Sequence, residues 1–134
     1  MRRNDEEYQI QKAFFQRVAL EKNRHPILNL LHASSNGARV GRTTAGKLKA
    51  TGLIPGVWDV HWPIARFGYH SLWMEFKSST GKLSKEQKEF GKLLRLEGNA
   101  IFVVRDWQTA WYAVTKYGWE KQVGFLTFHC PELD

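Results

Sequence analysis

The strongest constraint on the fold is a segment in the middle of the chain, residues 71–77, in which apolar residues alternate with other residues. Such alternation predicts a β-strand, because successive side chains of a strand point to opposite faces of the sheet. One face of the predicted strand carries the apolar side chains Leu72, Met74 and Phe76. The opposite face carries Trp73, Glu75 and Lys77. A carboxylate and an ammonium group therefore project side by side from one face of the predicted sheet.

A second segment, residues 57–62, has the same period of two. The pattern predicts that Trp58, Val60 and Trp62 share one face, and that Val57, Asp59 and His61 share the other. A loop of residues 63–68 connects the two segments, which predicts an antiparallel pair. If these strands pair, Asp59 stands beside Glu75 and Lys77.

Two neighbouring carboxylates and a lysine are the side chains that a hydrolytic metal site requires. Carboxylate oxygens suit a hard cation such as Mg²⁺, and a nearby lysine can orient or activate the attacking water. The alternative for Asp59, Glu75 and Lys77 is a salt bridge on a solvated sheet face, which contributes little to stability. A spacing this short does not decide between the two interpretations.

A helix is predicted near the amino terminus, over residues 4–20, with Asn4 as its N-cap. Ile10, Phe14 and Val18 form an apolar stripe, and Glu7 and Gln11 fall on the same stripe. Glu7 could complete a capping box with Asn4, or its carboxylate could join a metal site. Gln11 could equally be a polar residue at the rim of the core.

The remaining elements complete an alternation of helices and strands. We expect a short strand at residues 27–33, for which a helical turn is the alternative, and a helix at 43–51 that ends at Gly52. Ser84 and Gln87 form a capping box at the start of a helix that extends to residue 97. Residues of this helix that should face the sheet are Phe90, Leu93 and Leu94.

The wholly apolar run at residues 100–104 predicts a strand that is buried on both faces. Asp106 should cap a last helix that ends at residue 117, and residues 124–129 could form an extra edge strand. The order is helix, strand, helix, strand, strand, helix, strand, helix. It predicts an α/β domain with a central mixed sheet and flanking helices.

The length and charge of the chain limit its organisation and its partners. Its 134 residues suffice for one domain, residues 1–134, and are too few for two. The net charge of +7 favours a polyanionic partner, of which nucleic acid is the commonest. A single cysteine excludes an internal disulfide and a cysteine-based zinc site. We find no membrane span and no signal peptide, and therefore expect a cytoplasmic protein.

Four motifs in this order resemble the virus-type replication-repair nuclease family (VRR-NUC) of the PD-(D/E)XK restriction-endonuclease-like nucleases. They are Glu-Tyr-Gln-Ile-Gln at residues 7–11, Gly-Leu-Ile-Pro-Gly-Val-Trp-Asp at 52–59, Glu-Phe-Lys at 75–77 and Gly-Lys-Leu-Ser-Lys-Glu-Gln at 81–87. The resemblance covers residues 7–104. The proline that usually precedes the aspartate is Trp58 in this chain. A proline there only stiffens the entry to the strand.

The resemblance implies a restriction-endonuclease-like core and a set of site residues. Asp59, Glu75 and the Phe76 carbonyl would bind Mg²⁺ or Mn²⁺, and Lys77 would position or polarise the attacking water. Glu7 would complete the acidic cluster directly or through water, and Gln87 would point toward the site. The capping box with Ser84 explains Gln87 equally well.

The chain is therefore predicted to be a metal-dependent endonuclease that hydrolyses DNA and recognises its structure rather than its sequence. The cations expected to hold the phosphate backbone are Arg39, Arg42, Lys47, Lys49, Lys82, Lys85, Lys88 and Lys92. Its compact size resembles that of the stand-alone phage and bacterial members of the family. The alternative is a catalytically silent nucleic-acid-binding module with the same fold.

The aromatic residues of the last third of the chain suggest how the protein assembles. They are Trp107, Trp111, Tyr117, Trp119, Phe125 and Phe128. Aromatic residues are enriched in interface cores, although ordinary core packing accounts for them equally well. We expect a homodimer that uses this third of the chain, because two active sites could then cut the two strands of a four-way (Holliday) junction.

Overall fold

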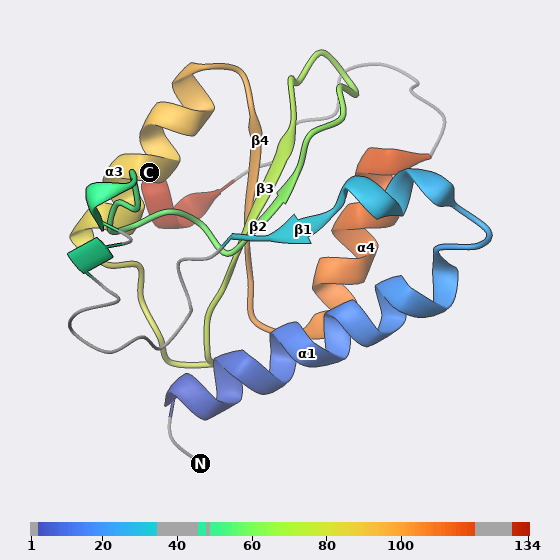
Figure 1. Ribbon diagram of the computed structural model, residues 1–134, viewed down its shortest axis with the longest axis horizontal. Coiled ribbons are helices and arrows are strands. Elements are labelled where there is room, and N and C mark those ends of the chain that lie inside the picture. The colour runs from blue at the N-terminus through green and yellow to red at the C-terminus, as the bar shows by residue number, and fades with distance from the viewer. Residues whose placement is uncertain (1–2, 35–45, 48, 120–129) are drawn as a thin grey trace.

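A mixed four-stranded sheet lies between helices in the computed structural model, which describes residues 3–34, 46–47, 49–119 and 130–134 (Figure 1). The α-helices are α1 (Arg3–Glu21), α3 (Lys85–Leu96) and α4 (Trp107–Gly118). The strands are β1 (His32–Ala33), β2 (Val60–Trp62), β3 (Leu72–Phe76) and β4 (Ala100–Val104). Two 3₁₀-helices complete the elements, η1 (Pro26–Leu30) and η3 (Pro131–Leu133).

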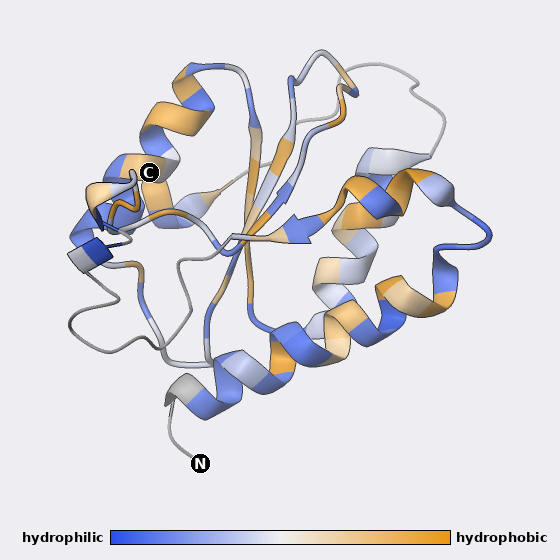
Figure 2. Cartoon of the chain, in the orientation of Figure 1, coloured by the Kyte–Doolittle hydropathy of each residue, from blue (hydrophilic) through white to orange (hydrophobic). Residues whose placement is uncertain are grey.

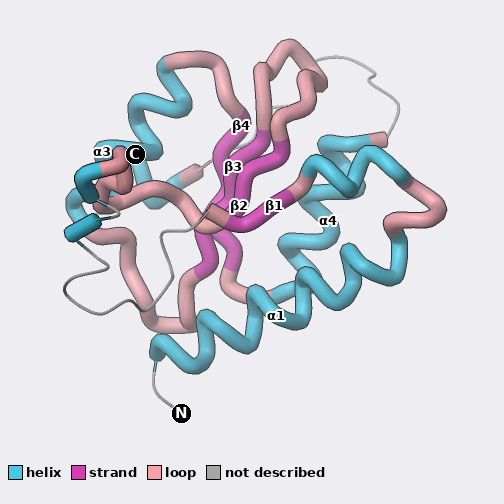
Figure 3. Tube along the Cα trace, viewed as in Figure 1, coloured by secondary structure: helices cyan, strands magenta, loops and turns pink. Residues whose placement is uncertain are grey.

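The strands lie side by side in the order β1-β2-β3-β4 (Figure 3). β2 runs antiparallel to both β1 and β3, with Val60 opposite Met74 and Trp62 opposite Leu72. β4 runs parallel to β3, and α3 forms the crossover between these two strands. The antiparallel hairpin and the mixed sheet are therefore as the sequence predicts.

Each face of the sheet has its own apolar core. On one face, α1 and α4 cover Leu72, Met74 and Phe76 of β3. On the other face, α3 and η3 pack over Trp73 and Ile101. Figure 2 shows this arrangement as largely apolar strands between helices that are hydrophilic on their outer sides. The α/β class, the alternation along β3 and the two-sided burial of β4 are confirmed.

Two boundaries near the amino-terminal half differ from the prediction. Helix α1 begins at Arg3, so Asn4 lies inside its first turn and is not the N-cap. Over residues 27–33 the predicted strand is present only at His32 and Ala33, which pair with β2, whereas the alternative of a helical turn is confirmed by the 3₁₀-helix η1 that Pro26 opens. Proline supplies no backbone N–H and a φ suited to the first turn of a helix, which explains the difference.

Trp58 does not share a face with Val60 and Trp62, as the period of two predicted. The chain bends at Asp59, before β2 begins. Trp58 therefore packs on the α3 side, whereas Val60 and Trp62 pack on the side of α1 and α4. A bend interrupts the alternation of side chains, which only a continuous strand maintains.

Helix α3 faces the sheet through Phe90 and Leu94, as predicted, but not through Leu93, which is 63% exposed. Gly91 lies beneath the ring of Trp58, and a Cβ added there would come within 2.5 Å of that ring. The close approach at Gly91 sets the rotation of the helix and turns Leu93 to solvent.

The remaining predictions about elements are confirmed as far as the described residues extend. The side chain of Asp106 caps α4, and Ala110 and Val114 face the core. Gly46, Lys47, Lys49 and Ala50 are helical, and Gly52 follows with a φ of 107°. The predicted edge strand at 124–129 lies outside the described residues. In the part of the chain that is described, no helix has the length and apolarity needed to cross a membrane.

The phenol of Tyr117 ties α4 to the loop that follows β2, and we expect its removal to destabilise the fold. Its hydroxyl is buried and donates a 2.6 Å hydrogen bond to the Ile64 carbonyl. Burial raises the pKa of Tyr117 to about 12, so the hydroxyl remains a donor throughout the physiological range. Tyr117→Phe leaves that carbonyl without its partner and should cost about 1–3 kcal/mol of unfolding free energy in urea.

The matched control is Tyr112→Phe on the same helix, where the side chain is 57% exposed. This variant should change the unfolding free energy by less than about 0.5 kcal/mol. Equal losses in the two variants would contradict the role of the Tyr117 hydrogen bond.

Candidate active site

Asp59 and Glu75 are brought together where the bend before β2 meets the end of β3. The backbone N–H of Asp59 donates to Glu75 Oε1 at 3.1 Å. In return, the Phe76 N–H donates to Asp59 Oδ2 at 2.9 Å. Each carboxylate is therefore anchored by a backbone N–H of the other segment, and the pair has one defined arrangement.

The environment of Glu75 is unfavourable for a negative charge. Its side chain is only 1% exposed. Burial raises the pKa of Glu75 most, and the neighbouring Asp59 carboxylate raises it further. The charge of Lys77 lowers the pKa, and the result is a pKa of about 10. The uncharged form of the Glu75 carboxyl is therefore favoured when no cation is bound.

A divalent cation fits the chemistry of this donor set. The two carboxylates and the neighbouring Phe76 carbonyl are oxygen donors, which Mg²⁺ and Mn²⁺ prefer. The positive charge that Glu75 requires in order to ionise is the charge that such a cation supplies. A salt bridge on a solvated face, the alternative interpretation, does not match a carboxylate that is buried.

Gln87 serves the helix cap and the acid pair at the same time. Its Oε1 accepts from the Ser84 N–H at 2.9 Å, and the Ser84 hydroxyl accepts from the Gln87 N–H at 3.1 Å. The Nε2 of the same amide donates to Glu75 Oε2 at 3.0 Å. The two explanations that the sequence left open for Gln87 are thus compatible.

Glu7 lies at the edge of the site rather than between the two acids. Its Oε1 accepts from the Ser78 N–H at 3.3 Å, immediately after Lys77. Among the described residues, no three His, Cys, Asp or Glu side chains gather closely enough to hold a metal ion. Direct binding of a metal by Glu7 therefore stays a prediction. Gln11 is half-buried, which fits a polar residue at the rim of the core.

Lys77 extends β3 by one residue beyond Glu75 and Phe76. Its backbone N–H donates to the Val104 carbonyl at 2.9 Å, which extends the pairing with β4 by one residue. The residue is 9% exposed, and its positive charge lowers the pKa of Glu75. A lysine whose charge acts on the acid pair is suited to hold a water molecule or a phosphate oxygen there.

The loop after Lys77 is held by residues that the sequence patterns did not identify. Arg105 Nη1 donates to the carbonyls of Ser78 and Gly81 at 2.6 and 2.8 Å. On the other side, Glu6 Oε1 accepts from the Ser79 N–H at 2.9 Å. These contacts join side chains to backbone groups that are distant in sequence, so no local motif indicates them.

Trp58 and Gly56 fix the bend that carries Asp59 against α3. The indole N–H of Trp58 donates to the Gln87 carbonyl at 2.9 Å. Gly56 has a φ of 88°, and a Cβ added there would approach the Glu86 backbone to 2.5 Å. The residue that replaces the usual proline of the motif therefore has a structural role, which is to attach the bend to the start of α3.

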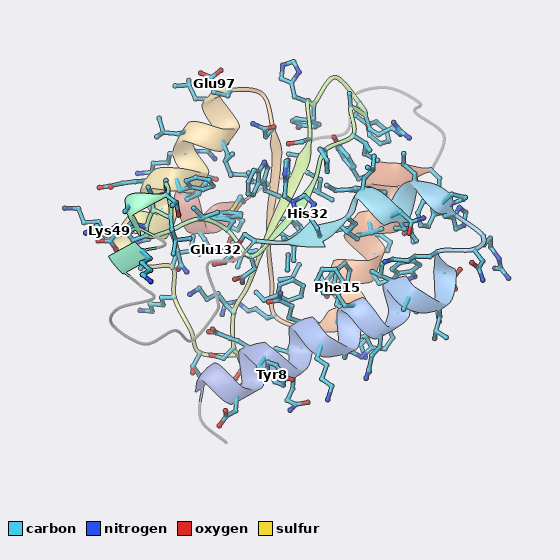
Figure 4. The ribbon with its side chains drawn as sticks, in the orientation of Figure 1. Tyr8, Phe15, His32, Lys49, Glu97 and Glu132 are labelled. Atoms are coloured by element: carbon cyan, nitrogen blue, oxygen red, sulfur yellow. The ribbon has the colours of Figure 1, made fainter. Side chains whose placement is uncertain are left out.

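The predicted phosphate contacts are exposed wherever they are described. Lys82 precedes α3, and Lys85, Lys88 and Lys92 lie on it. Lys47 and Lys49 lie on the helical segment after β1, and Figure 4 labels Lys49. Arg39 and Arg42 lie outside the described residues.

A histidine and a tryptophan extend the site face of the sheet. His61 lies directly opposite Trp73, and their rings stack at 4.0 Å with an interplanar angle of 17°. Burial, together with His32, lowers the pKa of His61 to about 4. The ring is therefore neutral at physiological pH.

Comparison with solved structures gives the same fold. A structure described as "VRR_NUC domain protein" superposes with a TM-score of 0.69 and 24% sequence identity, and the match covers 84% of this chain and 88% of the other. No family model matches the sequence. No curated protein matches it either. The comparison confirms the fold that the four motifs implied: the chain shares the α/β fold of this VRR_NUC domain protein.

Proposed function

We propose that this chain is a metal-dependent endonuclease of the VRR-NUC family that hydrolyses phosphodiester bonds in DNA. The observation that carries the proposal is the Glu75 carboxylate, which is buried beside Asp59 and Lys77. A purely binding module has no need for a buried carboxylate beside a second one, because phosphate is attracted by cations and repelled by carboxylates. The shared fold with a VRR_NUC domain protein and the net charge of +7 support the same function.

Each residue of the site has a defined task in this proposal. Asp59, Glu75 and the Phe76 carbonyl would hold Mg²⁺ or Mn²⁺. When bound, this ion supplies charge neutralisation at the non-bridging phosphate oxygens and acidifies water. Lys77 positions the attacking water, and Gln87 and the backbone N–H of Asp59 hold the Glu75 carboxylate in place. Glu7 and Arg105 hold the loop that follows Lys77.

The decisive experiment compares cleavage with binding. Purified protein is incubated with linear, flapped and four-way-junction DNA, with Mn²⁺, with Mg²⁺ or with EDTA, and products are resolved on denaturing gels. A nuclease cuts at least one branched substrate when either ion is present and none in EDTA. A catalytically silent module shifts the DNA in a binding assay under every condition and never cuts it.

Exposed lysines on and before α3 would hold the DNA backbone, and their removal should flatten the salt dependence of binding. Replacing Lys85, Lys88 and Lys92 together by glutamine should reduce the slope of log K against log salt by about 0.9 for each phosphate that is no longer neutralised. The weakening should be the same for unrelated DNA sequences, because phosphates carry no sequence information. A weakening confined to one sequence would indicate base reading and contradict this prediction.

A homodimer that places paired nicks in a four-way junction is the assembly we propose, in the cytoplasm of a bacterial or phage-infected cell. A two-fold dimer carries two active sites, so it could cut two strands of the junction at once, and the proposal rests on this match. Trp107, Trp111 and Trp119 pack against the main core, which is the alternative explanation for the aromatic residues of this region. Light scattering at micromolar concentration decides the matter: a mass near 15.6 kDa contradicts the dimer.

A further inference from the structure

Three rings form a row across three neighbouring strands. His32 of β1 lies opposite His61 of β2, which lies opposite Trp73 of β3. The His32 and His61 rings meet edge to face at 5.4 Å, and the His61 and Trp73 rings stack at 4.0 Å. Residues directly opposite one another in a sheet project from the same face, so the three side chains form one continuous surface, which we call the ring row.

The ring row lies beside the acid pair. Trp73 and Glu75 are two residues apart on β3 and therefore share a face, about 7 Å apart along the strand. His61 is paired with Trp73, so it is a diagonal neighbour of Glu75, at about 7–8 Å. A nucleotide whose phosphate lies at Asp59 and Glu75 would have its base within reach of these rings.

One end of the ring row is covered and the other is open. Phe90 of α3 packs against Trp73 edge to face at 5.5 Å, which closes the inner end. His32 lies on the edge strand β1 and is exposed (Figure 4). Its Nδ1 lies 2.9 Å from the Leu30 carbonyl, a contact that fixes the orientation of the ring. A fixed, exposed ring that is backed by two further rings is a surface for stacking.

We propose that the ring row binds an unpaired nucleobase of the DNA strand whose phosphate occupies the acid pair. The proposal rests on the proposed nuclease function and adds a specificity to it. Aromatic side chains stack on the face of any base, so such a site does not select a sequence. In a continuous duplex both faces of a base are already stacked on its neighbours. The ring row would therefore favour DNA with unpaired nucleotides at the cleavage point, such as a flap, a gap or a distorted junction.

The test measures stacking without cleavage. DNA that carries 2-aminopurine at an unpaired position is titrated with protein in EDTA, and fluorescence reports both stacking and affinity. Wild-type protein should quench the unpaired probe but not the same probe in a duplex. His32→Ala should weaken binding of the unpaired DNA about fivefold or more and leave duplex binding unchanged. His32→Phe should restore the quenching, because it restores an aromatic face.

His70→Ala is the matched control, since His70 is also exposed but lies in the loop before β3, outside the strands that carry the ring row. It should bind both DNAs as the wild type does. The inference is overturned if His32→Ala binds unpaired DNA as tightly as the wild type, or if it weakens binding of duplex and unpaired DNA equally. Wild-type protein would still cleave branched DNA in Mn²⁺ if only the ring-row proposal were wrong. Absence of that cleavage would instead contradict the proposed nuclease function, so the two failures are distinguishable.

Discussion

Asp59→Asn should lose at least roughly 10³-fold in the rate of DNA cleavage while it still folds and binds DNA. The asparagine side chain can still accept the Phe76 N–H through its oxygen, so the anchor of the bend is retained. What the substitution removes is the negative charge that a divalent cation requires. Cleavage is measured in single-turnover assays with Mn²⁺, and DNA affinity is measured in EDTA. The affinity should stay the same or increase, because one source of phosphate repulsion is gone.

The control for this variant is Glu97→Gln, which changes an exposed carboxylate just beyond α3. Its cleavage rate should match that of the wild type. Thermal unfolding with and without Mn²⁺ gives an independent readout, since a ligand that binds the native state raises the melting temperature. Wild-type protein and the control should gain stability from the ion, and Asp59→Asn should not. An Asp59→Asn variant that cuts at the wild-type rate would place the active site elsewhere.

Lys77→Met should reduce the cleavage rate by about 10²-fold or more, the cost of losing one well-placed electrostatic group. Methionine retains much of the buried length of the lysine stem, so the fold should survive at a site that is 9% exposed. Metal binding, measured by calorimetry, should persist, because the carboxylates of Asp59 and Glu75 remain. The reduction would then be in the chemical step, visible in single turnovers at saturating DNA.

Lys12→Met serves as the matched change on the exposed side of α1, where the lysine lies over the ring of Tyr8. Its single-turnover rate should be that of the wild type. If Lys77→Met instead abolishes metal binding together with cleavage, Lys77 has a structural role in holding the acid pair.

The acid pair could be predicted from the sequence because local rules are sufficient there. β3 is a continuous strand, so a period of two correctly assigns Leu72, Met74 and Phe76 to one face and Trp73 to the other, which Glu75 shares. The capping box at Ser84 is a local pattern as well, and it is present. These rules place Asp59 near Glu75 only if the strands pair in the observed register, and the short loop between the strands favours that pairing.

Local rules fail where the chain departs from a regular element or where the partner is a distant backbone group. The alternation assigns Trp58 to the wrong face because the strand does not extend through the bend at Asp59. Helical periodicity assigns Leu93 to the core, but the ring over Gly91 sets the rotation of α3. Arg105 binds two carbonyls more than 20 residues away, and such a contact depends on the tertiary structure.

The side-chain amide of Gln87 links the start of α3 to the Glu75 carboxylate, because it hydrogen-bonds to both. Glutamate at this position would retain the capping box but place a third carboxylate against Glu75. Alanine would remove the bond from the Ser84 N–H at the helix start and one of the two hydrogen bonds that hold the Glu75 carboxylate, leaving the bond from the Asp59 N–H. Substitution of Gln87 is therefore limited both by the helix cap and by the hydrogen bond to Glu75. A designer who wishes to move the acid pair to another scaffold must transfer the start of α3 with it. The portable unit is the strand end of β3 together with the first turn of α3, rather than the acids alone.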